Sequence, residues 1–199
     1  EIHTPEAPDK NAKPDALRLY FYNPENSQKP AARIDLINSQ VKKGVTIQPA
    51  IKGQWRFESA NSLVFQPEQH WPAGVAYQVQ LSPDIFAKGS HLADTKLAFT
   101  TQPFSLQLQK FNFYQDPENS QIKKVVATVS ASHPIDKQSF EKNIQLTMPV
   151  ISKNKAEKQQ AFAFTVTYDK YQQQAFIHSE TISLPEQSNY MHLHIKPKV

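Results

Sequence analysis

Residues 54–65 read QWRFESANSLVF, and this short stretch decides the fold class. Trp55 and Phe57 stand two positions apart, and so do Leu63 and Phe65. Because side chains alternate between the two faces of a strand, each pair lies on a single face. Polar residues between the two pairs are typical of a turn. The stretch therefore predicts two short strands, each with large apolar side chains on one face.

Similar short alternating runs continue along the chain, and the 3.6-residue spacing of a helix is almost absent. We expect strands at residues 17–22, 32–37, 45–47, 54–57, 62–65, 77–81 and 96–101, and further strands at 104–113, 124–131, 144–148, 161–168, 174–178 and 190–195. The sequence pattern at residues 83–87 predicts one short helical turn, with Ser82 as its N-cap. Many short strands separated by turn residues are typical of antiparallel β-sandwiches, so the predicted fold class is all-β.

The pentapeptide PENSQ occurs twice, at residues 24–28 and, 93 positions later, at residues 117–121. Each copy follows an aromatic run and precedes an alternating one, and the offset is about the size of one small sandwich. We interpret this order as two tandem β-sandwich domains in register. The expected boundaries give a flexible N-terminal tether at 1–15, a first domain at 16–102 and a second domain at 103–199.

The second domain is predicted to differ from the first at two places. The run at 77–81 corresponds best to residues 190–194, 113 positions later, so the second copy carries extra residues. Part of this excess is a polar hairpin tip at 152–160, and such loops tolerate insertion. No counterpart of the run at 96–101 follows residues 190–195. Either the second domain is closed differently or it is truncated at its C-terminal end, and we favour truncation.

The composition excludes several kinds of site. None of the 199 residues is a cysteine, which excludes disulfides, thiol nucleophiles and zinc–thiolate centres within this segment. Four dispersed glycines exclude a glycine-rich phosphate loop. The formal net charge of +4 comes from dispersed lysines, for example at 42–43, 123–124 and 153–158. We interpret them as solubilising charge and expect no nucleic-acid partner, with a basic patch as the alternative. No apolar run approaches the length of a membrane span.

Candidate catalytic and metal-binding residues are few. His192 and His194 share one strand face and could chelate zinc or copper, but no third ligand lies near them in the sequence. The alternative, which we favour, is a solvated strand face with Met191, Leu193 and Ile195 turned inward. Asp35 is expected to be exposed or paired with Arg33. Because no supported constellation of catalytic groups is found, we expect no enzymatic activity and no catalytic, cofactor-binding or metal-binding residues.

The aromatic residues allow two interpretations. Flat exposed rings would form a carbohydrate-binding platform, whereas regular alternation favours a sandwich core for Trp55, Phe57, Leu63 and Phe65. Trp71 precedes a Pro-Ala-Gly turn, and the sequence leaves open whether it plugs the end of the sandwich or stands exposed.

Two groups of motifs resemble a known family. Residues 50–57 (AIKGQWRF), 63–67 (LVFQP) and 71–79 (WPAGVAYQV) resemble the N-terminal region of bacterial alpha-2-macroglobulins, with Phe57 in place of a second Trp and Val75 in place of Thr. Generic bacterial immunoglobulin-like domains share part of this pattern. Residues 111–117, 126–136 and 140–146 resemble the macroglobulin-type domain that follows in these proteins, and the phrase SHPID at 132–136 is the most specific part.

The resemblance implies two tandem immunoglobulin-like or macroglobulin-type sandwiches that form an N-terminal scaffold fragment of a periplasmic protease trap. Such proteins cage a protease after it cleaves a bait segment, and many bond to it through a Cys–Gln thioester; this segment holds neither. The implied partners are downstream domains of the same chain, target proteases met by the full-length protein, and a periplasmic peptidoglycan synthase. The resemblance implies membrane attachment only through a lipid anchor outside this segment. The alternative is a stand-alone cell-surface adhesin or carbohydrate-binding module.

Overall fold

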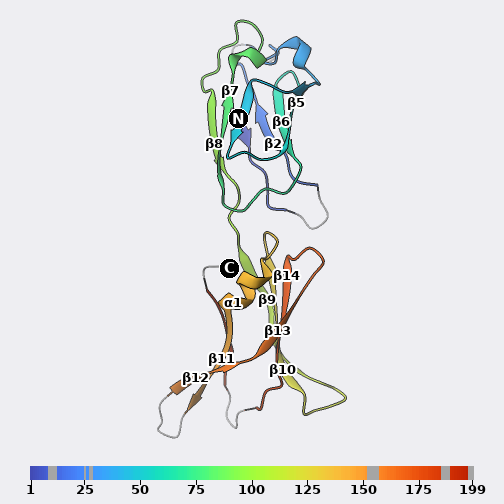
Figure 1. Cartoon of the computed structure of the whole chain (residues 1–199), viewed down its shortest axis with the longest axis vertical. Coiled ribbons are helices and arrows are strands. Elements are labelled where there is room, and N and C mark those ends of the chain that lie inside the picture. Colours follow the sequence, from blue (N-terminus) through green and yellow to red (C-terminus); the bar gives the residue numbers. More distant parts are fainter. Residues whose placement is uncertain (9–12, 25, 27–28, 152–156, 185–188, 197–199) are drawn as a thin grey trace. The chain divides into compact units, whose positions relative to one another are not determined.

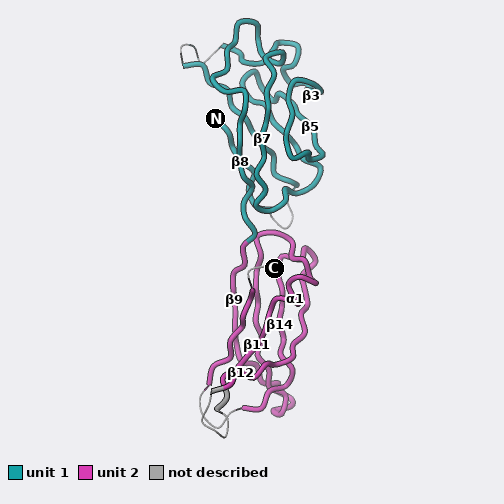
Figure 2. Tube along the Cα trace, turned by 60° about the vertical axis from the view of Figure 1, so that its left-hand side comes forward, with its two compact units in different colours: residues 1–104 teal, residues 105–199 magenta. Residues whose placement is uncertain are grey.

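The computed structural model describes residues 1–8, 13–24, 26, 29–151, 157–184 and 189–196 of the chain. It divides the chain into two compact units, unit 1 at Glu1–Phe104 and unit 2 at Ser105–Val199 (Figure 2). Strands contain 47% of the residues and helices 7%, which confirms the all-β fold class and the tandem sandwiches. No helix in the described ranges has the length and apolar character needed to cross a bilayer.

Unit 1 consists of two antiparallel sheets (Figure 1). The five-stranded sheet has the order β1 (Ile2–His3), β2 (Leu17–Tyr20), β6 (Ser62–Pro67), β5 (Gly53–Ser59) and β3 (Gln40–Val41). The three-stranded sheet has the order β4 (Val45–Gln48), β7 (Ala76–Leu81) and β8 (Lys96–Thr100). Two 3-10 turns, η1 (Ile34–Leu36) and η2 (Pro83–Ile85), lie in the connections.

The core of unit 1 is built from the alternating residues that the sequence singles out. Trp55 and Phe57 of β5 and Leu63 and Phe65 of β6 are all buried, which confirms the core interpretation. Direct pairing of Trp55 with Phe65, and of Phe57 with Leu63, places these side chains on one face of the sheet. Burial of large aromatic side chains is the dominant stabilising contribution in such a core.

Unit 2 has the same two-layer arrangement. Its four-stranded sheet has the order β13 (Phe164–Tyr168), β14 (Gln174–Ser179), β10 (Lys123–Ala131) and β9 (Leu106–Gln115). Its three-stranded sheet has the order β12 (Glu157–Phe162), β11 (Ile144–Ile151) and β15 (His192–Ile195). One helix, α1 (Lys137–Asn143), connects β10 to β11.

The two units follow one topology. In unit 1 the chain forms β1 and β2, crosses to the other sheet for β4, returns for β5 and β6, and crosses again for β7 and β8. In unit 2 the same path runs through β9 and β10, then β11, then β13 and β14, then β15. Strands β3 and β12 are additional edge strands. Among the described residues, unit 2 has no strand in the position of β8.

The two PENSQ copies occupy different places in this topology. Pro24 follows β2, the second strand of its unit, whereas residues 117–121 connect β9, a first strand, to β10. The prediction that the pentapeptide marks equivalent positions in register is therefore wrong. The shared architecture does not depend on it, because turn-forming residues such as Pro and Asn suit either connection. Residues 25, 27 and 28 of the first copy lie outside the described residues.

Two predicted strands are wrong, for different reasons. Residues 32–37 contribute only isolated bridges at Ala32 and Ile37, with η1 between them, and Ile34 is 86% exposed instead of inward. The run at 161–168 divides at Ala163, because β12 pairs with β11 whereas β13 pairs with β14 in the other sheet. Alternation alone does not show where a chain crosses between layers.

The expected tether at 1–15 also differs from the structure at its start. Ile2 and His3 pair with Leu19 and Arg18 of β2, and the N-terminal ammonium group donates a 2.7 Å hydrogen bond to the carbonyl of Tyr20. Pairing satisfies backbone groups at the edge of the sheet, so these residues belong to unit 1. Residues 9–12 lie outside the described residues, as do residues 152–156 of the expected hairpin tip, although β11 and β12 on either side pair as a hairpin.

The remaining strands match the prediction within three residues at each end. The helical turn at 83–87 is confirmed as η2, where the Ser82 hydroxyl oxygen accepts a hydrogen bond from the Asp84 N–H. Helix α1 was not predicted. It has seven residues, of which only Phe140 is fully buried, so it is too short to show helical periodicity.

Candidate functional site

Two histidines lie side by side on the solvent-facing side of β15. The rings of His192 and His194 are 5.9 Å apart, and His194 Nε2 is 3.1 Å from Thr147 Oγ1 on the neighbouring strand. Leu193 and Ile195 alternate with them and are only partly exposed, as the sequence predicts. In the described part of the chain, no group of three His, Asp or Glu side chains could hold a metal ion. Within that part of the chain the pair has no third protein ligand of the kind that a zinc site uses.

Trp71 plugs the core of unit 1 and is 4% exposed. Its Nε1–H donates a 2.8 Å hydrogen bond to the carbonyl of Asp15. Its ring packs edge-on against Tyr77 and Phe99, with centroid distances of 5.2 Å and 5.6 Å. Burial also raises the pKa of Tyr77, since the ionised phenolate would be poorly solvated there. A ring enclosed in this way has no face on which a sugar could stack, which decides the question that the sequence leaves open.

The turn after Trp71 explains the WPAGV phrase. Thr101 is buried, and its hydroxyl donates to the Pro72 carbonyl at 2.6 Å and accepts from the Val75 N–H at 2.9 Å. Gly74 has a φ of +64°, a left-handed conformation that favours glycine, and its N–H donates to the Gln102 carbonyl at 2.9 Å. The motif therefore anchors the start of β7 to the end of β8.

The SHPID phrase at 132–136 forms a second structural junction, this one in unit 2. Asp136 caps α1 by accepting a 2.7 Å hydrogen bond from the Ser139 N–H, and Ile135 is buried beside it. His133 is buried as well, with Nδ1 at 2.9 Å from the Ser132 hydroxyl. The phrase thus starts a helix at the end of β10 and positions buried side chains beneath it.

A tight turn between β13 and β14 holds the SHPID phrase in place. The Asp169 carboxylate accepts 2.8 Å hydrogen bonds from the N–H groups of Gln173 and Gln174. The Gln172 carbonyl then accepts from the Ile135 N–H at 2.7 Å, and the Gln173 side chain donates to the Ser132 carbonyl at 3.2 Å. These bonds join two connections that are distant in sequence, so the phrase has a structural role in unit 2.

Tyr168 links α1 to the sheet of unit 2. Its hydroxyl donates a 3.0 Å hydrogen bond to Glu141, its ring lies 6.3 Å from that of Phe140, and the Lys137 ammonium is 5.2 Å from its ring centre. Burial raises the pKa of Tyr168, and the hydrogen bond to Glu141 raises it further. A tyrosine that stays neutral in this way can donate a hydrogen bond but supplies no nucleophile.

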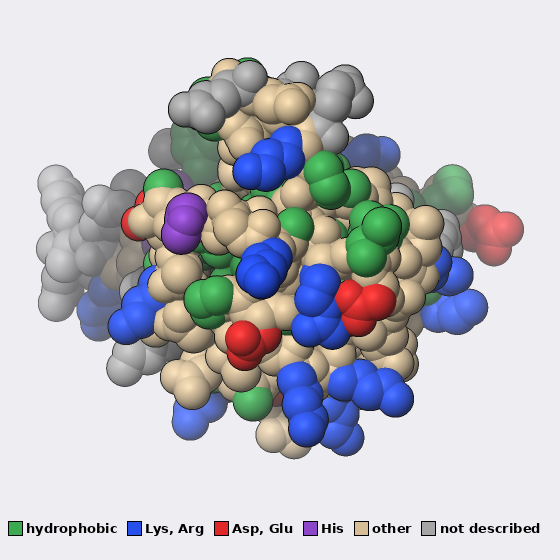
Figure 3. Space-filling view, turned by 90° about the horizontal axis from the view of Figure 1, so that it is seen from above, with side chains coloured by type: hydrophobic (Ala, Val, Ile, Leu, Met, Phe, Trp, Pro, Cys, Tyr) green, Lys and Arg blue, Asp and Glu red, His purple; other side chains and the backbone are tan. Residues whose placement is uncertain are grey.

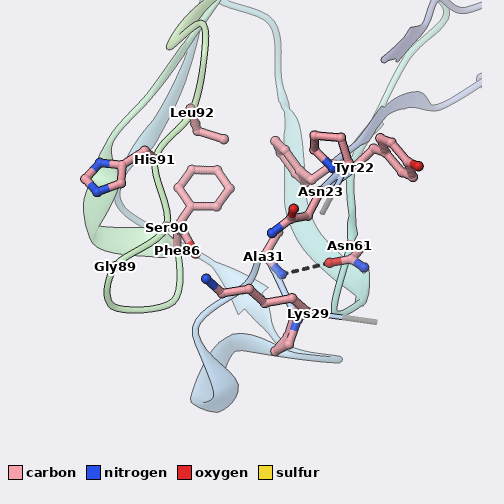
Figure 4. Close-up of a pocket in the computed structure, with 13 residues that line it drawn as sticks. Tyr22, Asn23, Lys29, Ala31, Asn61, Phe86, Gly89, Ser90, His91 and Leu92 are labelled. Atoms are coloured by element: carbon pink, nitrogen blue, oxygen red, sulfur yellow. Dashed lines mark hydrogen bonds between the residues drawn. The ribbon is translucent and has the colours of Figure 1, made fainter. Parts of the chain in front are cut away.

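A cleft of about 400 Å³ opens on unit 1 between the loop after β2 and the loop after η2 (Figure 4). Phe86 and Leu92 form its apolar wall, the ring of His91 points away from them, and Asn61 closes one side by accepting a 2.7 Å hydrogen bond from the Ala31 N–H. None of the described lining residues is a carboxylate, so they include no pair of carboxyl groups for acid–base catalysis. Pro24 and Lys29 border it next to residues 25, 27 and 28, which the structure does not describe.

Basic side chains on unit 1 are interrupted by acidic ones. Figure 3 shows Lys and Arg side chains at several separate places, with Asp and Glu beside some of them. Arg33 donates two 2.7 Å hydrogen bonds to the Asp35 carboxylate, which confirms the predicted pairing. These hydrogen bonds lower the pKa of Asp35 and raise that of Arg33. Such an arrangement is typical of a solubilising surface rather than a phosphate-binding face.

Sequence reasoning missed the apolar groove of unit 2, about 350 Å³ in volume, which lies between β9 and β10 on one side and Met148 and Met191 on the other. Its signal was present as apolar residues along β9, but alternation does not reveal whether a face is covered. Taken together, the described residues define a class of protein: a chain of antiparallel β-sandwiches whose most specific motifs hold the fold together.

Comparison with curated proteins gives the family. The chain is 35% identical over 188 residues, 94% of its length, to an alpha-2-macroglobulin homolog from Yersinia pestis. It is 31% identical over 166 residues, 80% of its length, to the alpha-2-macroglobulin of Pasteurella multocida, and 28% identical over 117 residues, 59% of its length, to that of Rickettsia conorii. The chain belongs to the bacterial alpha-2-macroglobulin family, and this confirms the resemblance carried by its motifs.

The chain spans only a small part of these relatives, 9% of the length of the first two proteins and 6% of the third. No family model matches the sequence, and no solved structure matches it.

Proposed function

We propose that this chain is a scaffold segment in the N-terminal part of a bacterial alpha-2-macroglobulin, a periplasmic inhibitor that traps proteases. The observation that carries the proposal is the similarity to the Yersinia pestis homolog over 94% of the chain and only 9% of that protein. A segment without cysteine cannot itself hold a Cys–Gln thioester. The proposal therefore assigns the segment a structural role, with no catalytic step.

The structure supports a structural role through the positions of its most specific motifs. The WPAGV and SHPID phrases, which carry the family resemblance, form hydrogen-bonded junctions and supply the buried residues Trp71, His133 and Ile135. Conversely, the carbohydrate-binding alternative loses its strongest candidate residue because Trp71 is enclosed. Partners are proposed at the level of the longer protein: its downstream domains, the proteases it encounters and a periplasmic peptidoglycan synthase. We place it at the inner membrane through a lipid anchor outside this segment.

The test compares the full-length protein with the 199-residue chain in a protease protection assay. Trypsin that is caged by the full-length protein should lose activity toward a large protein substrate but keep activity toward a small chromogenic peptide. The 199-residue chain should leave both activities unchanged. Inhibition of trypsin by the 199-residue chain would overturn the structural role, and a full-length protein that leaves protein digestion unchanged would overturn the trap.

A second readout comes from the gene. A reading frame of well over a thousand codons, with a lipobox upstream and a Cys-x-x-Gln motif downstream, is expected if the parent protein is an anchored trap with a thioester. If the reading frame lacks the Cys-x-x-Gln motif, the protein would trap proteases by caging alone, without a thioester bond. A short frame would overturn the proposal.

A further inference from the structure

Unit 2 exposes apolar side chains on the inward face of its edge strand β9. Leu108, Phe111 and Phe113 pair directly with Val129, Ala127 and Val125 of β10, all of which are buried. Residues directly opposite each other in an antiparallel pair share a face, so these three side chains point toward the core. Leu108 and Phe113 are nevertheless 51% and 50% exposed. The opposite sheet therefore does not cover this part of β9.

The opposite sheet is incomplete at the same side of unit 2. Leu193 and Ile195 of β15 pair with the buried residues Leu146 and Ile144 and share their inward face, yet both are only partly buried. The groove between the two sheets is lined by Phe111 and Phe113 from one side and by Met148 and Met191 from the other. Among the described residues, β9 and β15 at this side of unit 2 each have a neighbouring strand on one edge only.

Unit 1 shows what occupies this position when the sandwich is closed. Its strand β8 pairs with β7, the counterpart of β15, and directs Leu97 and Phe99 inward opposite Val79 and Tyr77. Leu97 lines the same hollow as Glu1, which precedes β1, and Leu19 of β2, so β8 lies across from the first strands of the unit. Ile2 of β1, the counterpart of β9, shares the face of its partner Leu19 and packs against the core, whereas Leu108 and Phe113 of β9 are about half-exposed.

The backbone of β15 is also unpaired along its outer edge in the described residues. The N–H of Lys196 donates to the Asn143 carbonyl at 2.9 Å, toward β11. Because successive N–H groups of a strand point to opposite edges, those of Leu193 and Ile195 point away from β11. No described strand pairs with that edge. An edge with free donors and acceptors is a ready template for another strand.

We propose that the free edge of β15 binds an antiparallel β-strand from elsewhere in the same, longer polypeptide, with apolar side chains at alternate positions. This strand takes the place that β8 takes in unit 1, pairs with Leu193 and Ile195, and covers Leu108, Phe111 and Phe113. Main-chain hydrogen bonds provide affinity, and the apolar groove selects for the alternating pattern. The proposal shares with the proposed function the premise of a longer chain, but it does not depend on protease trapping.

The experiment measures amide hydrogen exchange by NMR in the 199-residue chain and in a longer chain from the same gene, extended by about 30 residues to allow for a connection and a strand. The N–H groups of Leu193 and Ile195 should exchange rapidly in the shorter chain and about 100-fold more slowly in the longer one. His194, whose N–H points toward β11, is the internal control and should be protected in both chains. Equal exchange of Leu193 and Ile195 in the two chains would overturn the proposal, while leaving the protease test unaffected.

A second copy of the chain is the competing occupant. Protection of Leu193 and Ile195 in the 199-residue chain that rises with concentration, together with a dimer mass by light scattering, would overturn the assignment to the same polypeptide. The variant Phe113→Lys tests the groove, because a charge on its wall should remove most of the added protection in the longer chain. Ile34→Lys, at an exposed position of unit 1, is the matched control and should retain the protection.

Discussion

Units 1 and 2 follow the same strand path, but they differ in how that path is closed. In unit 1 the short strand β1 pairs with β2, β8 pairs with β7, and Ile2 of β1 packs against the core. In the described part of unit 2, β9 is ten residues long and β15 has no outer neighbour; Leu108 and Phe113 of β9 stay about half-exposed, and Leu193 and Ile195 of β15 are only partly buried. The difference indicates that burial depends on the completeness of the opposing sheet as well as on the residue pattern.

The cores also differ in composition. Unit 1 is filled by an aromatic cluster in which Trp71 contacts Phe65, Tyr77 and Phe99. In unit 2, Phe140 from the helix is the one fully buried aromatic side chain among the described residues, and the others are aliphatic. Unit 1 is therefore expected to depend on a few large rings, whereas unit 2 depends more on the junction between α1 and the sheet.

Truncation of Trp71 should give the largest effect and break unit 1 selectively. Trp71→Ala leaves a cavity among three aromatic rings and removes the hydrogen bond to Asp15, so we expect about 3–5 kcal/mol lower free energy of unfolding. Both tryptophans lie in unit 1, so fluorescence of the remaining Trp55 during urea unfolding reports on this unit alone. The control Tyr190→Ala, at a 75% exposed position of unit 2, should change stability by less than about 0.5 kcal/mol. Unchanged Trp55 unfolding in Trp71→Ala would contradict the proposed role of the ring.

Much of the fold could be predicted from the sequence, because most strands bury one face and show it as alternation. Trp55, Phe57, Leu63 and Phe65 were assigned to the core correctly for this reason. Residues 32–37 alternate equally well but form η1, and the run at 161–168 continues through a crossing between sheets. Local pattern carries no information on which sheet a strand joins.

The candidate sites were less predictable because their character depends on distant contacts. The sequence left the exposure of Trp71 open, and its burial requires the carbonyl of Asp15, 56 residues earlier. The groove beside β9 could not be predicted, since Leu108 and Phe113 read as ordinary inward residues. The repeated PENSQ was misleading, because a polar pentapeptide suits any exposed turn.

Loss of the helix cap should test the junction of unit 2 with a smaller effect. Asp136→Ala removes the hydrogen bond to the Ser139 N–H at the start of α1, so we expect about 1 kcal/mol lower stability of unit 2. The variant Asp136→Ser keeps a capping oxygen and should lose only a part of this. Hydrogen exchange at Phe140 and calorimetry of the whole chain provide the measurement. A loss in unit 1 rather than unit 2 would contradict the independence of the two cores.

Buried Tyr77 of unit 1 and partly buried Tyr168 of unit 2 should respond differently to removal of their hydroxyl groups. Tyr168→Phe removes the hydrogen bond to Glu141, with an expected cost of about 0.5–1.5 kcal/mol to unit 2 at pH 7. Tyr77→Phe should lower the stability of unit 1 by less. Burial is the cause of the raised pKa of Tyr77, with no hydrogen bond among the described residues contributing to it, so the substitution removes no such bond. Urea unfolding of both variants at pH 7 makes the comparison, and an equal loss in the two variants would refute it.

The stability of unit 2 at high pH provides a further test of the role of Tyr168. The raised pKa of Tyr168 keeps its phenol neutral in the folded state, whereas in the unfolded chain it ionises near the ordinary value of 10.0. The stabilisation is therefore fully present below pH 10 and is lost as the pH rises above it. Unit 2 should therefore lose stability as the pH rises above about 10, and Tyr168→Phe should lose less over the same rise. Parallel pH profiles of the two proteins would contradict the raised pKa of Tyr168.

Breaking the surface pair of Arg33 and Asp35 should have the smallest effect on stability among these substitutions. Arg33→Gln breaks a pair whose side chains are both half-exposed, where water and salt screen the attraction, so we expect no measurable change in the unfolding of unit 1. The lowered pKa of Asp35 means that any stabilisation is present above the ordinary carboxyl pKa and is lost as the pH falls through the lowered value. Unfolding of both proteins at pH 7 and pH 3, in low and high salt, tests this. A clear, salt-independent loss in Arg33→Gln at pH 7 would show that the pair anchors the region around η1, and that unit 1 depends on more than its aromatic core.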